Sequence, residues 1–115
     1  MHENDYYQAL FEQIVTALKK ELMGKNEFEY KGNKIKFKSI PSIHIEKIKN
    51  EVKLHKLFSG QPSQLSIEGS LRIEQIDDKF TKTKDYKFWI QELTFRFNQS
   101  SERFEVLKIG KLIAL

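Results

Sequence analysis

The fold class is decided by the stretch QLSIEGSLRIEQ, residues 64–75. Leu65, Ile67, Leu71 and Ile73 share one parity along this stretch, and polar side chains occupy the other parity. Successive side chains of a β-strand point to opposite faces, so the pattern predicts a strand with one buried and one solvent-facing side. The apolar runs that follow repeat the alternation less regularly. The C-terminal half is therefore predicted to form an antiparallel sheet that packs over another layer.

Length and composition predict one independent domain spanning residues 1–115, because 115 residues with 39% hydrophobic content suffice for a core. The absence of cysteine excludes a disulfide framework, a zinc–thiolate site and a thiol nucleophile. The N-terminal segment is amphipathic rather than continuously apolar, so neither a signal peptide nor a membrane span is predicted. We therefore expect a cytoplasmic protein, or a component of a virion or similar assembly, with no membrane partner.

An amphipathic helix is predicted over residues 5–23. Asp5 and Gln8 have the spacing of a capping box, and Gly24 stands where a left-handed residue often ends a helix. The apolar positions recur every three or four residues, at Tyr7, Leu10, Phe11, Ile14, Leu18 and Leu22. This spacing predicts that one face of the helix packs on a core.

Two extended runs within residues 27–38 predict a β-hairpin whose turn contains Gly32. Its predicted inner face carries Phe28, Tyr30, Ile35 and Phe37. Residues 42–48 are expected to form a strand, and residues 51–57 an irregular segment or a second strand. Helical spacing across residues 45–58 leaves a helix open as the alternative.

The apolar parity changes at Gln91 and Glu92 within a strand predicted over residues 86–98. A β-bulge would reconcile the two halves, but we favour an arrangement in which both faces of the strand are covered, one by the helix and the other by a partner or by the curl of the sheet. Further strands are predicted over residues 103–109 and 111–115, and residues 77–85 are predicted to be an exposed polar loop. Because bulges often lie beside functional sites, we select one candidate interface, formed by Tyr86, Phe88, Trp89, Gln91 and Glu92.

Together these segments predict an α+β fold. The N-terminal amphipathic helix is expected to pack on a curved, mainly antiparallel sheet of about five or six strands.

Basic residues concentrate in the middle of a chain whose net charge is +4, since residues 25–56 contain nine lysines and four acids. A polyanion would be contacted by Lys34, Lys36, Lys38, Lys47, Lys49, Lys53 and Lys56. Lysine lacks the bidentate guanidinium fork, and Glu27 and Glu29 can pair with these lysines across the predicted hairpin. A solvated charged face is therefore favoured over a phosphate-binding surface.

No catalytic, metal-binding or cofactor-binding motif is recognisable. His2, His44 and His55 are scattered without ligand spacing, and no glycine-rich run precedes a helix. We therefore expect no enzyme activity, no metal and no cofactor.

Three classes of function remain. The favoured class is a non-catalytic structural or interaction subunit that assembles with itself or another protein, in a bacterial, phage or mobile-element setting. The first alternative is a nucleic-acid-binding module that uses the lysines of residues 25–56, with Trp89 or Tyr86 stacking on bases. The second alternative is a small-ligand pocket with Glu92 as a polar contact.

Overall fold

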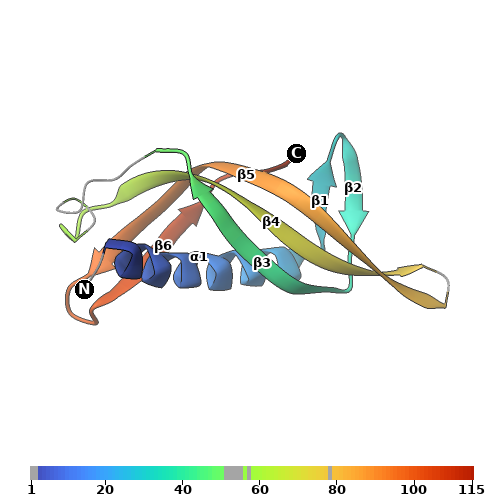
Figure 1. Ribbon diagram of the computed structural model, residues 1–115, viewed down its shortest axis with the longest axis horizontal. Helices are drawn as coiled ribbons and strands as arrows, with labels where there is room; N and C mark the ends of the chain where they lie inside the picture. The colour runs from blue at the N-terminus through green and yellow to red at the C-terminus, as the bar shows by residue number, and fades with distance from the viewer. Residues whose placement is uncertain (1–2, 51–55, 57, 78) are drawn as a thin grey trace.

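The computed structural model describes residues 3–50, 56, 58–77 and 79–115, and it shows an α+β fold (Figure 1). The described residues form one helix, α1 (Glu3–Lys25), and seven strands. The strands are β1 (Glu27–Tyr30), β2 (Asn33–Lys36), β3 (Ser39–Ile48), β4 (Ser63–Asp77), β5 (Phe80–Asn98), β6 (Arg103–Ile109) and β7 (Leu112–Ala114). The predicted helix, hairpin and C-terminal strands are confirmed. The strand predicted over residues 42–48 begins three residues earlier, and most of the predicted 51–57 segment lies outside the described residues.

The strands form two antiparallel sheets. One is the β1–β2 hairpin, and the other has the order β3-β4-β5-β6, with β7 also pairing with β5. The 19-residue strand β5 is long enough to pair with β6 over one part of its length and with β7 over another. The larger sheet has five strands, within the five or six expected, and the separate hairpin brings the described strands to seven. The expected curvature is not confirmed, because neither sheet is strongly curled.

The helix α1 packs along one face of the larger sheet (Figure 1). Its predicted apolar stripe is confirmed, since Leu10, Ile14 and Leu18 are at most 1% exposed. The predicted role of Gly24 is wrong, because the helix continues through this residue to Lys25. Asn26 provides the left-handed conformation instead, with φ 56°, and its amide donates to the Leu22 carbonyl at 2.8 Å. Asparagine tolerates this conformation better than most residues do.

A β-bulge accounts for the parity change in β5. Ile90 lies opposite Ile67 and Leu93 lies opposite Leu65, so β5 has one extra residue at positions 91–92. The apolar side chains on both sides of the bulge therefore face the same core, and Ile90 and Leu93 are fully buried. The arrangement that we favoured, with both faces of the strand covered, is wrong within this chain, because Gln91 and Glu92 are exposed.

Residues 77–85 were predicted to be a loop, and this prediction is wrong. β4 continues to Asp77 and β5 begins at Phe80, with the pairs Gln75–Lys82 and Ile76–Thr81 between them. Backbone ladder bonds form without an apolar core, so a polar sequence can extend a ribbon whose inner part is already packed. We call residues 74–77 and 79–84 the arm. The arm projects from the body of the molecule beyond the β1–β2 hairpin (Figure 1). The longest dimension of the molecule is 51 Å.

Candidate functional site

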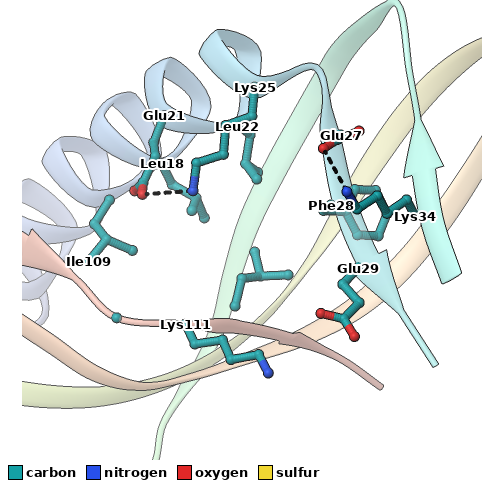
Figure 2. Close-up of a pocket in the computed structure, with 12 residues that line it drawn as sticks. Leu18, Glu21, Leu22, Lys25, Glu27, Phe28, Glu29, Lys34, Ile109 and Lys111 are labelled. Carbon is teal, nitrogen blue, oxygen red and sulfur yellow. Dashed lines mark ion pairs between the residues drawn. The ribbon is translucent and has the colours of Figure 1, made fainter. Parts of the chain in front are cut away.

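A groove of about 460 Å³ opens between the C-terminal end of α1, strand β1 and the link from β6 to β7 (Figure 2). It is lined by Leu18, Glu21, Leu22, Lys25, Glu27, Phe28, Glu29, Lys34, Ile109, Gly110, Lys111 and Leu112. The C-terminal end of α1 and the hairpin that follows it therefore meet the distant link between β6 and β7. The volume lies within the range of sites that hold small ligands or single side chains of a partner.

The floor of the groove is apolar. Leu18 and Leu22 lie one helical turn apart on the buried face of α1, and Phe28 is buried on β1. Ile109 and Leu112 flank the link between β6 and β7 and are half-buried. An apolar group that entered the groove would contact side chains of all three elements.

The rim of the groove is charged. Lys25 pairs with Glu21 at 3.7 Å, and Lys34 pairs with Glu27 at 3.9 Å. Among the described residues, Glu29 and Lys111 form no ion pair. The rim therefore offers one unpaired carboxylate and one unpaired ammonium group to a partner.

Strand edges border the groove on two sides. In the described part of the chain, β1 is bonded only to β2 and β7 only to β5. The other edge of each strand faces the groove (Figure 2). The amide of Gly110 donates to the Glu92 carbonyl of β5 at 2.7 Å and so holds the link between β6 and β7 against β5. Backbone donors and acceptors are thus available beside an apolar floor, a combination that extended peptides recognise.

The five candidate interface residues lie in different environments. Phe88 is fully buried and belongs to the core, so it has no surface to offer a partner. Tyr86 is half-buried on the same face, and burial raises the pKa of its hydroxyl. Trp89 lies on the opposite face, where its indole Nε1 donates to Ser66 Oγ at 2.8 Å. Gln91 and Glu92 are exposed at the bulge. Glu92 was expected to be a polar contact in a ligand pocket, but its side chain does not line the groove.

A small apolar patch on the solvent-facing side of the sheet contains Trp89. Ile113 on β7 lies opposite it in the strand register, and Leu115 follows two residues later. Leu115 is 53% exposed, and the two other side chains are half-buried. We call Trp89, Ile113 and Leu115 the outer-face patch.

The candidate polyanion-binding lysines do not form one surface, which corrects the sequence-based grouping. Lys38 and Lys49 flank opposite ends of β3, and eleven residues of extended chain separate them by about 36 Å. Lys49 is also paired with Glu68 at 3.1 Å. Lys53 lies outside the described residues. The sequence cluster is therefore divided between the two ends of the molecule.

A second hollow, of about 320 Å³, lies on the solvent-facing side of β3, β4 and β5 and includes His44. The guanidinium of Arg72 donates two hydrogen bonds to the Asp85 carboxylate, at 2.7 and 3.2 Å, and this lowers the pKa of Asp85. Lys87 donates to Glu46 at 2.8 Å and lowers the pKa of that carboxyl. These acidic and basic groups stabilise one another in their charged forms.

The described residues contain neither a metal-binding cluster nor a helix that could span a membrane. No group of three or more described histidine, aspartate or glutamate residues could hold a metal ion. The described helix is not apolar enough to cross a membrane. The sequence matches no protein-family model, and comparisons with curated proteins and with solved structures find no match either.

Proposed function

We propose that this protein is a non-catalytic interaction subunit that docks in a larger complex by accepting an extended apolar segment of another protein in the groove. The observation that carries the proposal is the apolar floor beside two unpaired strand edges. An extended segment can bond to a strand edge through its backbone while alternate side chains enter a neighbouring hollow.

The charges around the groove support recognition rather than catalysis. Four of the six charged side chains in its lining are in ion pairs with one another. Catalytic acids and bases usually depend on burial or on close like charges that shift their pKa towards neutrality. The unpaired Glu29 and Lys111 instead suit a partner segment that carries one charge of each sign beside its apolar anchor.

The proposal is tested with a library of random linear peptides displayed on phage. We expect the wild-type protein to enrich peptides with apolar residues at alternate positions, and the variant Leu112→Asp to lose them. The matched control is Leu107→Asp, because Leu107 is an apolar β6 residue outside the groove and is 44% exposed. Failure to enrich any peptide would refute the proposal, as would peptides that bind the Leu112→Asp variant as tightly as wild type.

A second candidate function, self-assembly, is favoured by the outer-face patch. Two copies could bury Trp89, Ile113 and Leu115 against each other, although one small patch supplies less apolar area than most stable dimers bury. Sedimentation velocity over a wide concentration range tests this candidate. We expect weak association in the wild type and its loss in Ile113→Lys, and a strict monomer at every concentration would eliminate self-assembly.

A further inference from the structure

The arm carries a row of lysines on the face that continues from the core. The Lys38 amide donates to the Glu74 carbonyl at 2.8 Å, which sets Lys38 next to the Glu74–Gln75 segment of β4, and Gln75 is paired with Lys82 on β5. Lys38 and Lys82 are therefore about 10 Å apart across two strand spacings, and Lys84 follows Lys82 by about 7 Å along β5. Lys38, immediately before β3, and Lys82 and Lys84 on β5 thus contribute to one basic surface.

These lysines have no acidic partners in the described part of the chain. Lys38, Lys82 and Lys84 are exposed, and none of them forms an ion pair. The nearby acids are occupied on the opposite face, where Asp85 binds Arg72 and Glu74 accepts a hydrogen bond from the Ser39 hydroxyl at 3.1 Å. A further acid, Asp77, ends β4 and is paired with Phe80, so we restrict the basic surface to Lys38, Lys82 and Lys84.

An exposed aromatic ring lies at the end of the same face. Phe80 alternates with Lys82 and Lys84 along β5, so the three side chains share one parity. The Phe80 ring is 78% exposed, so its face is accessible to a partner. The residues Lys38, Phe80, Lys82 and Lys84 are called the basic aromatic face below.

We propose that the basic aromatic face binds single-stranded nucleic acid, with the lysines contacting phosphates and the Phe80 ring stacking on a base. Proteins that bind single strands combine these two features, and stacking on an aromatic ring requires no particular base sequence.

The placement of the charges distinguishes this partner from an anionic membrane. A membrane-binding tip needs its basic residues in one plane near the inserted ring, because the surface potential decays within a Debye length of about 8 Å. Lys79 is adjacent to Phe80 and Lys82 is about 7 Å from it, whereas Lys84 lies four residues away along the extended strand, or about 13 Å. A flexible polyanion that runs along the arm can reach all of these groups.

The experiment measures fluorescence anisotropy of a labelled 12-nucleotide oligo(dT) with the full chain at several salt concentrations. Three lysine contacts predict a slope of about −2 in log affinity against log salt. Phe80→Ala should weaken oligo(dT) binding about fivefold or more, the low end of the range for one stacked base. The same variant should leave the binding of inorganic polyphosphate unchanged, because polyphosphate has no bases.

Variants that remove equal charge from different surfaces distinguish binding at the basic aromatic face from the effect of the overall positive charge. Lys82→Gln with Lys84→Gln should reduce the magnitude of the salt slope by about 1.4. Lys19→Gln with Lys20→Gln removes the same charge from the exposed side of α1 and should leave the slope unchanged. Thermal unfolding of each variant verifies that it is folded.

Four results would overturn the inference. They are no oligo(dT) binding at 20 mM salt, equal effects of Phe80→Ala on oligo(dT) and polyphosphate, tighter binding of a duplex of equal length, and tighter binding of phosphatidylserine vesicles. The arm lies outside the groove, so each of these results leaves the peptide-docking proposal intact.

Discussion

Substitution of Gly69 by alanine should destabilise the fold strongly, because two neighbours occupy the space that a Cβ atom would need. An added Cβ would overlap the carbonyl oxygen of His44 and lie 2.8 Å from Cζ of Phe88. The carbonyl belongs to the backbone of β3, which pairs with β4 at this point, and the ring is fully buried. Neither group can move without disturbing the sheet or the core.

The expected cost follows from two opposing effects. Overpacking a core typically costs about 1–3 kcal/mol, and the immovable backbone places this site at the upper end. Replacing glycine within a strand recovers about 0.5–1 kcal/mol of backbone entropy. We therefore expect a net loss of about 2 kcal/mol. For 115 residues this corresponds to a decrease in melting temperature of about 8 °C.

Urea unfolding of Gly69→Ala and Gly24→Ala provides the assay and its control. No atom lies within 4 Å of a Cβ added at Gly24, and this residue has helical rather than left-handed geometry. The control substitution should therefore stabilise the protein by about 0.5–1 kcal/mol. A loss below about 0.5 kcal/mol for Gly69→Ala would contradict the overpacking argument. A destabilised Gly24→Ala variant would mean that Gly24, rather than Asn26, caps the helix.

Three further predictions concern single contacts. Gly110→Ala should lower the unfolding free energy by about 1–3 kcal/mol in urea, because its Cβ would overlap the Glu92 carbonyl oxygen, and an unchanged midpoint would contradict this. The lowered pKa of Asp85 means that its pair with Arg72 stabilises the fold above the ordinary carboxyl pKa of about 4, and this stabilisation is lost as pH falls through the lowered folded pKa. The difference in urea midpoint between wild type and Arg72→Gln should therefore shrink between pH 6 and pH 2, and a constant difference would show that the pair contributes nothing. Trp89→Phe should cost about 1 kcal/mol by removing the indole donor to Ser66, and the cost should disappear in a Ser66→Ala background.

Most of the fold could be predicted from the sequence. The helix and the strand at residues 64–75 have regular apolar periods, and burial of one face follows directly from such a period. The bulge at Gln91 and Glu92 was also visible as a change of parity, but the sequence alone did not show that both halves face one core. That result depends on the pairing of β5 with β4.

The errors arose where backbone pairing overrides local composition. Residues 77–85 are polar enough to resemble a loop, yet the ladder between β4 and β5 continues through most of them. Gly24 resembled a helix cap because glycine adopts left-handed conformations readily, yet the helix continues to Lys25 and Asn26 adopts the left-handed conformation.

The candidate sites depended even more on tertiary structure. The groove combines residues from positions 18 to 34 with residues 109 to 112, and no sequence pattern joins these segments. The basic aromatic face adds Lys82 and Lys84 to Lys38, whereas Lys47 and Lys49 lie at the other end of β3. Residues that are close in sequence can lie far apart on the surface when an extended strand separates them, as β3 separates Lys38 from Lys49.

The sequence by itself determined an α+β domain, since the periods of its apolar residues specify a helix and a set of strands with one buried face each. Its strand at residues 64–75 also placed Glu68, Arg72 and Glu74 on the face away from the core, as the structure shows. Only the tertiary structure decided how far β4 and β5 extend beyond the core and which charged groups meet at their end. The physical reason is that burial is encoded locally along each strand, whereas strand length and surface charge depend on pairing between residues distant in the chain.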